Sequence, residues 1–346
     1  MDLQVLWFCL VGFFFAGYFV LEGFDFGVGL LLPFLPRNEE ERSTMFRTIG
    51  PVWDGNEVWL VVAGAAMFAA FPAWYATMFS GFYLAFLLLL VALIARGVSF
   101  EFYGKRDSPR WRRAWDAATT WGSLLAPLLI GLALGNLLGG VPIGPDQEYA
   151  GTFADLLNGY SLFTGVTVVL LCLLHGASFL ALKTDGEVRE RALRVGRWVA
   201  PVAAAAVLGF AVWTQATAGS WSLFLVVAVL AAMAAAWQVG RGRDGVAFAA
   251  TSVTMAAVVV SVFVALYPRV MVSSLGSASD LTVSNTASSP YALKVMTVAA
   301  AVLFPVVLAY QAWTYYTFRR RIGGSATAAA PPDPDQAARQ ATTPEA

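Results

Sequence analysis

Long runs of apolar residues alternate with short polar segments along the chain. A helix that crosses a membrane needs about 20 mostly apolar residues, and by that criterion we find about nine runs. They lie at 3–33, 52–71, 76–95, 117–138, 160–182, 198–216, 221–239, 246–267 and 291–317. The pattern therefore predicts an all-α polytopic membrane protein with about nine transmembrane helices.

Composition supports this class and excludes others. Of the 346 residues, 58% are hydrophobic and only 13% are charged, whereas soluble domains carry roughly a quarter charged residues. The 22 basic and 22 acidic residues cancel, so no basic excess is present to bind nucleic acid. One histidine and two cysteines leave too few ligands for a multi-metal site or a disulfide framework. We expect no metal site in this chain.

The positions of the basic residues predict the orientation. Of the 22 Lys and Arg residues, all except Arg269 and Lys294 lie in connections on the same side of the predicted helices. Cytoplasmic loops carry such an excess, so we expect the N-terminus outside and the C-terminus in the cytoplasm, as an odd number of spans requires. Residues 1–321 would form the transmembrane domain. Residues 322–346, rich in Gly, Ala, Pro and Thr, are expected to be a disordered cytoplasmic tail.

Two carboxylates lie deep inside the first predicted span. With a rise of 1.5 Å per residue from the inner end at Pro33, Asp25 lies about 12 Å and Glu22 about 16 Å deep. Their spacing places them on one helix face. Acids at this depth are costly and are functional candidates by default. Two poorly hydrated neighbours should not both be ionised, which suits a proton relay. The alternative is a packing role, since Gly23 and Gly27 form a small-residue face; both roles can hold together.

A second acidic pair, Asp54 and Glu57, lies at the inner start of the second run. The spacing matches an acidic variant of a capping box, an ordinary structural role. The functional alternative makes Asp54 a proton-collecting group at the cytoplasmic mouth.

Arg96 ends the third run, with Glu101 after it. We expect Arg96 to extend to the membrane interface, the alternative being a counter-ion of Asp54 or Asp25. The lone His175 is more simply hydrogen-bonded than metal-bound.

At these residues the sequence resembles subunit II of the cytochrome bd-type quinol oxidases of bacteria. Two eight-residue blocks carry most of the resemblance: Glu-Gly-Phe-Asp-Phe-Gly-Val-Gly at 22–29 and Trp-Asp-Gly-Asn-Glu-Val-Trp-Leu at 53–60. Shorter blocks follow in the family's order at 69–72, 80–83, 131–140, 288–297 and 310–313. The resemblance covers almost the whole chain except the tail.

The resemblance implies two four-helix bundles plus a peripheral helix, in the bacterial plasma membrane. It implies a larger partner, subunit I, that ligates two b-type haems and one d-type haem and oxidises quinol at the outer side. Oxygen is reduced to water with cytoplasmic protons, so charge separates across the membrane. This chain would supply proton access and assembly surface and carry no catalytic residue. Some family members hold a structural quinone in this subunit, and small accessory subunits are left open.

The resemblance also implies roles for single residues. Asp54 and Asp25 match carboxylates of proton entry, and Glu22 stands where some members have aspartate. The expected supporting residues are Arg96, Trp53, Asn56, Glu57 and Glu101. Composition agrees on one point independently: three haems need several axial ligands, and a chain with one histidine cannot supply them.

Two other functions remain in view. A stand-alone secondary transporter would use Glu22 and Asp25 to couple ions to a solute, but such transporters usually carry matching half-chain repeats. We find no second Glu-Gly-Phe-Asp block. A passive assembly scaffold is the third possibility.

Overall fold

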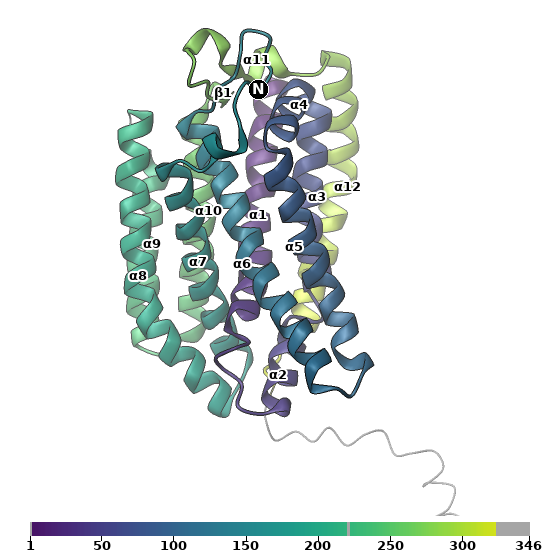
Figure 1. Cartoon of the computed structure of the whole chain (residues 1–346), viewed down its shortest axis with the longest axis vertical. Helices are drawn as coiled ribbons and strands as arrows, with labels where there is room; N and C mark the ends of the chain where they lie inside the picture. The colour runs from purple at the N-terminus through teal and green to yellow at the C-terminus, as the bar shows by residue number, and fades with distance from the viewer. Residues whose placement is uncertain (1, 220–221, 323–346) are drawn as a thin grey trace, which may run out of the picture.

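The computed structural model describes residues 2–219 and 222–322 (Figure 1). Within these ranges, eight helices are long and apolar enough to cross a membrane. They are α1 (Leu3–Leu31), α5 (Tyr83–Phe102), α6 (Pro109–Gly139), α7 (Gly159–Lys183), α8 (Gly186–Ala218), α9 (Leu223–Gly240), α10 (Asp244–Leu266) and α12 (Pro290–Thr317). The all-α polytopic fold is confirmed. Of the expected tail at 322–346, Ile322 is hydrogen-bonded to Lys183, and residues 323–346 lie outside the described residues.

The second and third predicted spans differ from expectation. The run at 52–71 forms α3 (Trp53–Ala70), which is not among the eight because its first turns are polar. The run at 76–95 is divided between α4 (Pro72–Gly81) and α5. Pro72, which has no N–H to continue α3 and favours the first turn of a new helix, starts α4 four residues before the predicted run. The break within the run falls at Phe82, between α4 and α5. Apolar composition alone did not indicate this break.

Seven of the eight apolar helices, together with α3, form two groups of four in the described part of the chain. In one group, α7, α8, α9 and α10 each pack against the next, and α10 returns to α7. In the other, α1 packs against α3 and α6, and α6 against α5, whereas α3 and α5 do not pack closely together. Helix α12 runs along the outside with only Leu293 buried. This arrangement matches the expected two bundles and peripheral helix, with one bundle open between α3 and α5.

The two groups meet where α1 crosses α7, and glycines allow their backbones to touch. A Cβ atom on Gly27 would lie 2.0 Å from the carbonyl oxygen of Cys172 and 2.7 Å from the Cα of Gly176. The expected packing role of the glycines beside the acids is therefore confirmed at Gly27. Gly23 instead faces the side chain of Met255 in α10.

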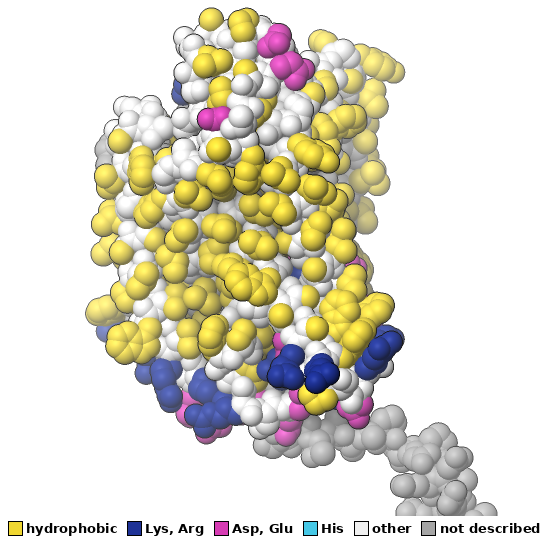
Figure 2. All heavy atoms as spheres, viewed as in Figure 1, with side chains coloured by type: hydrophobic (Ala, Val, Ile, Leu, Met, Phe, Trp, Pro, Cys, Tyr) yellow, Lys and Arg dark blue, Asp and Glu magenta, His cyan; other side chains and the backbone are white. Residues whose placement is uncertain are grey.

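Short elements cover the two ends of the bundle. One end carries α11 (Val283–Thr286), the 3-10 helices η2 (Phe153–Leu156) and η3 (Ser277–Ser279), and a two-stranded antiparallel sheet of β1 (Arg269–Met271) and β2 (Leu281–Thr282). The opposite end carries α2 (Glu39–Ile49) and η1 (Tyr103–Lys105). Lys and Arg side chains gather mainly at the α2 end, below an apolar band (Figure 2). This is the end that the sequence predicts to face the cytoplasm.

Candidate functional site

Both acids of α1 point into the protein. Glu22 and Asp25 have no solvent-exposed surface. Glu22 Oε1 lies 2.5 Å from Arg96 Nη1, so the two form an ion pair inside the bundle. Burying a charge in a low-dielectric interior is tolerated only when it is paired. The pair therefore explains how Glu22 is accommodated.

Arg96 is not at the membrane interface, and that expectation is wrong. The side chain is completely buried, and its guanidinium lies 4.8 Å from the ring centre of Phe26 and 5.3 Å from that of Phe100. Long basic side chains often extend to water at the interface, but Arg96 instead pairs with the buried carboxylate of Glu22. The alternative was that Arg96 is a counter-ion of an acid. Arg96 does pair with an acid, but this acid is Glu22 rather than Asp54 or Asp25. Arg96 Nη1 also lies 3.8 Å from Glu57 Oε2.

Asn56, on α3, links Asp25 of α1 to α12. Its Nδ2 atom donates to Asp25 Oδ2 at 2.7 Å and to the carbonyl oxygen of Leu21 at 3.0 Å. Its Oδ1 atom accepts from Gln311 Nε2 at 3.1 Å and from Tyr315 Oη at 2.8 Å. Sequence reasoning missed the roles of Gln311 and Tyr315. The sequence did contain a sign of these roles: Gln311 and Tyr315 are polar, lie four residues apart in the apolar run 291–317, and so share one helix face.

The expected capping box at the start of α3 is wrong. The N-cap is Val52, with no side-chain cap hydrogen bond. The backbone N–H of Asn56 donates to the carbonyl oxygen of Val52 at 3.0 Å, so the helix starts at Trp53 and Asp54 lies in its first turn. Asp54 is exposed there. A carboxylate in this turn still meets the positive end of the helix dipole.

Of the other predicted supporting residues, Glu57 and Trp53 lie near the buried cluster and Glu101 does not. Glu57 is partly buried, with 24% of its side chain exposed, and it faces Arg96. Trp53 packs against Phe100 with ring centres 4.7 Å apart. Glu101 lies exposed on α5, and no hydrogen bond or ion pair joins it to the cluster within the described ranges. The structure therefore brings Arg96, Glu57 and Asn56 together with the acids of α1. Among the described residues, Asp54 lines the same groove as Glu57 but forms no hydrogen bond or ion pair with the cluster, and Glu101 lies apart.

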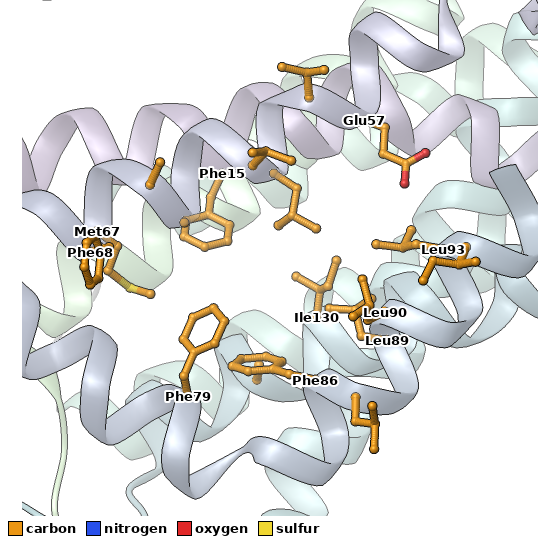
Figure 3. Close-up of a pocket in the computed structure, with 18 of the residues that line it drawn as sticks. Phe15, Glu57, Met67, Phe68, Phe79, Phe86, Leu89, Leu90, Leu93 and Ile130 are labelled. Carbon is orange, nitrogen blue, oxygen red and sulfur yellow. The ribbon is translucent and has the colours of Figure 1, made fainter.

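A groove opens between α3 and α5, where these helices do not pack together. It has a volume of about 1030 Å³. Its walls are mostly apolar, with Phe15, Phe79 and Phe86 among them, and Asp54 and Glu57 lie at one end. The carboxylate of Glu57 points into the groove (Figure 3). Glu57 therefore lies between the groove and the buried Arg96.

His175 is not available as a haem or metal ligand in this fold. Its Nδ1 atom lies 2.6 Å from Thr251 Oγ1, and its Nε2 atom lies 3.1 Å from the carbonyl oxygen of Val20. The ring also stacks on Phe248 at 4.5 Å. Both ring nitrogens of His175 are therefore engaged within the chain. In the described part of the chain, no group of three or more His, Cys, Asp or Glu residues could hold a metal ion.

Comparison with known proteins identifies relatives over nearly the whole chain. The family model for cytochrome bd terminal oxidase subunit II matches residues 3–318. The cytochrome bd ubiquinol oxidase subunit 2 of Bacillus subtilis (strain 168) is 45% identical over 328 residues, which cover 93% of this chain and 97% of that protein. The cytochrome bd-I ubiquinol oxidase subunit 2 of Escherichia coli (strain K12) is 36% identical over 364 residues, covering 92% and 95%.

A solved structure has the same fold. A chain of the bd oxidase from Geobacillus thermodenitrificans superposes with a TM-score of 0.69 over 92% of this chain and 99% of that one. The two are 21% identical in sequence, so this likeness supports the fold alone.

Proposed function

From the premise that the chain belongs to the cytochrome bd terminal oxidase subunit II family, we propose that it supplies protons and an assembly surface to a haem-bearing subunit I. Family membership and the eight apolar helices make it a multi-pass protein of the bacterial plasma membrane. As a subunit 2, it belongs to a terminal oxidase complex that contains a subunit I. The proposed partner holds two b-type haems and one d-type haem and oxidises quinol at the outer side.

One observation supports the proton-supply role: a series of polar groups leads from an exposed acid, Asp54, towards two buried ones, Glu22 and Asp25. Asp54 and Glu57 line the same end of the groove. Glu57 faces Arg96, which pairs with Glu22, and Asp25 lies one turn further along α1. Carboxylates can accept and release protons in turn, and intramembrane acids of this kind mark proton relays. We place the α2 end, and therefore Asp54, on the cytoplasmic side.

The assembly surface is proposed to lie on α3, α5 and α12. Helix α12 exposes nearly all of its apolar residues, among them Val302 and Val306, and α5 exposes Leu90 and Ile94. The groove with the acids opens on this face, so a partner bound here would receive protons directly. The groove is also the proposed place for a structural quinone, because its volume and apolar walls suit a long apolar chain.

Replacing Asp54 or Asp25 with asparagine tests the function. Each variant should give a complex that assembles, with both subunits and haem d absorbance intact, but consumes oxygen roughly tenfold more slowly or worse. The control is Asp107→Asn, a change at an exposed carboxylate outside the site. Normal turnover in both site variants would leave only the passive scaffold. The stand-alone transporter gains no support, since α7 to α10 carry no pair of acids at mid-depth in their described residues.

A further inference from the structure

Helix α12 is attached to the rest of the chain both by packing, as where Phe304 contacts Phe14, and by polar contacts. Only Leu293 of its 28 residues is buried. At the outer end, Trp7 Nε1 donates to Thr297 Oγ1 at 3.0 Å. Further along, Gln311 and Tyr315 reach Asn56. The three polar contacts lie at different heights along α12, so they fix the position of this helix against α1 and α3.

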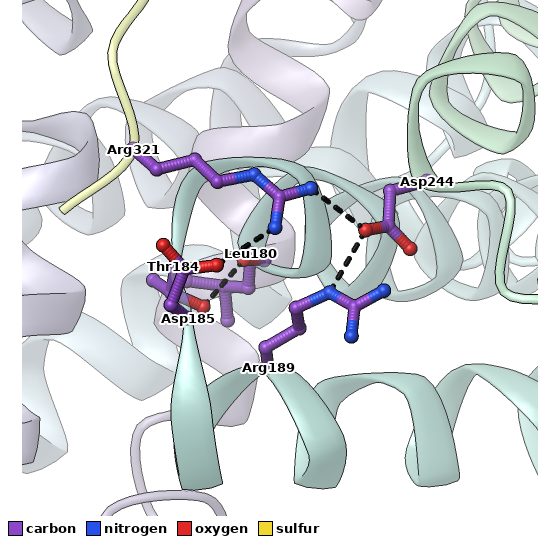
Figure 4. Close-up of polar contacts among 6 residues, drawn as sticks. All are labelled: Leu180, Thr184, Asp185, Arg189, Asp244 and Arg321. Atoms are coloured by element: carbon purple, nitrogen blue, oxygen red, sulfur yellow. Dashed lines mark hydrogen bonds and ion pairs between the residues drawn. The ribbon is translucent and has the colours of Figure 1, made fainter. Parts of the chain in front are cut away.

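The end of α12 at the α2 side of the molecule is held by an ionic cluster (Figure 4). Arg321 Nη1 donates to Asp185 Oδ1 at 2.8 Å, and its Nη2 donates to Asp244 Oδ2 at 3.0 Å. Arg189 Nε donates to the same oxygen of Asp244 at 2.9 Å. The backbone N–H of Ile322 donates to the carbonyl oxygen of Lys183 at 2.8 Å. These contacts connect the segment after α12 to α7, α8 and α10, and so limit how far α12 can slide or rotate.

We propose that Tyr315 and Gln311 are positioning residues that hold the side-chain amide of Asn56, and through it the carboxylate of Asp25, in one arrangement. The inference rests on the proposed function, since it assigns a role in proton supply to a helix that carries none of the acids. It adds a role for α12 beyond its exposed apolar face.

The hydrogen bonds of Asn56 carry the argument. A side-chain amide has two donor hydrogens and an oxygen with two lone pairs, and here all four are used. The residue is completely buried. If Tyr315 and Gln311 could not donate, Oδ1 would be a buried acceptor without a partner, which is costly. The amide would then move to find one, and its bond to Asp25 would weaken.

The carboxyl of Asp25 has one neutral side-chain donor, Asn56, and lies within hydrogen-bonding reach of the Glu22 carboxyl. Asn56 is its hydrogen-bond donor through Oδ2, and Oδ1 has no partner within the described ranges. The charged and titratable groups facing this acid are Glu22 on α1, Glu57 on α3, Arg96 on α5 and Tyr315 on α12. A donor stabilises the ionised carboxyl, so losing it favours the protonated acid.

The test uses the assembled oxidase with Tyr315→Phe and, separately, Gln311→Leu. Tyr315→Phe removes one oxygen and keeps the ring, and Tyr316→Phe is the matched control, because that neighbouring ring is 62% exposed. Oxygen consumption per haem is measured across pH. The infrared carboxyl band of Asp25, identified by its loss in Asp25→Asn, is recorded in parallel. We expect turnover at neutral pH to fall about two- to tenfold in each site variant. In both site variants, the acid limb of the plot of oxygen consumption against pH and the carboxyl band of Asp25 should shift. Neither should change in the control.

The outcomes separate this inference from the proposed function. If Asp25→Asn slows turnover but neither site variant moves the pH profile or the carboxyl band, the positioning role is overturned and proton supply stands. A smaller amount of assembled oxidase with normal turnover per haem and an unmoved band also overturns it. If Tyr315→Phe moves the band while Asp25→Asn leaves turnover normal, the positioning role stands and the proton-supply function fails.

Discussion

Replacing Arg96 with methionine should destabilise the complex far more than the loss of a surface charge would. Arg96 is completely buried, pairs with Glu22 at 2.5 Å, and lies 3.8 Å from Glu57. Methionine fills a similar volume without the charge, so the carboxylate of Glu22 loses its counter-ion. Breaking a buried ion pair from one side costs about 3–5 kcal/mol. We expect a loss of this size in the free energy of unfolding.

The partner substitution should cost less, and the reason lies in the geometry. In Glu22→Gln, the guanidinium of Arg96 still has Glu57 within 4 Å and keeps its contacts with aromatic rings. In the double variant neither charge is left alone, so part of the single-variant losses should return. We expect a coupling of about 2 kcal/mol, at the upper part of the range measured for residues in direct contact.

The assay is a double-mutant cycle on the purified complex, following the loss of helical circular dichroism with increasing denaturant. Arg112→Met is the matched control, because Arg112 pairs with Asp107 at 2.6 Å where both side chains are exposed. Surface pairs contribute little, so its midpoint should stay close to that of the unchanged protein. Strictly additive effects of Arg96→Met and Glu22→Gln would refute the reasoning, since the two side chains would then act independently.

Two further predictions concern packing and acid stability. Gly27→Val should prevent assembly, because a Cβ there meets the backbone carbonyl of Cys172 at 2.0 Å. The control Gly64→Ala, where nothing lies within 4 Å, should assemble normally. Equal yields of assembled complex from the two variants in membranes would contradict the close contact at Gly27. Burial works against the charge of Glu41, but the hydrogen bonds from Arg191 and from the backbone N–H of Arg37, with the attraction of both positive charges, together outweigh it and lower the pKa of the Glu41 carboxyl below 4.5. The pair therefore adds stability above about pH 4.5 that is lost as the pH falls towards the lowered pKa. In Glu41→Gln, the denaturant midpoint should therefore fall less between neutral and acidic pH than in the unchanged protein. An identical dependence of the midpoint on pH in the two proteins would exclude a contribution of the Glu41–Arg191 pair to stability.

The chain's pattern predicted most of the fold because membrane insertion is a local property. About 20 apolar residues in succession are enough to indicate a helix, and α6, α7, α10 and α12 were placed within a few residues at their outer ends. The pattern failed at a break inside a continuous apolar stretch, where α4 ends at Gly81 and α5 begins at Tyr83. The acids Glu22 and Asp25 were found for a similar reason, since charged groups at this depth are rare.

What the sequence determined by itself was therefore the class of protein, the number of helices to within one, the acids of the site and the inability of a single histidine to hold three haems. The tertiary structure alone decided which side chains meet. Arg96 reaches Glu22 from a helix 74 positions away, and Gln311 reaches Asn56 across a separation of 255. Such contacts depend on the rotation and register of helices packed side by side, and these follow from the fit of whole helix surfaces at contacts such as Gly27 with Gly176. No pattern within one helix encodes that fit.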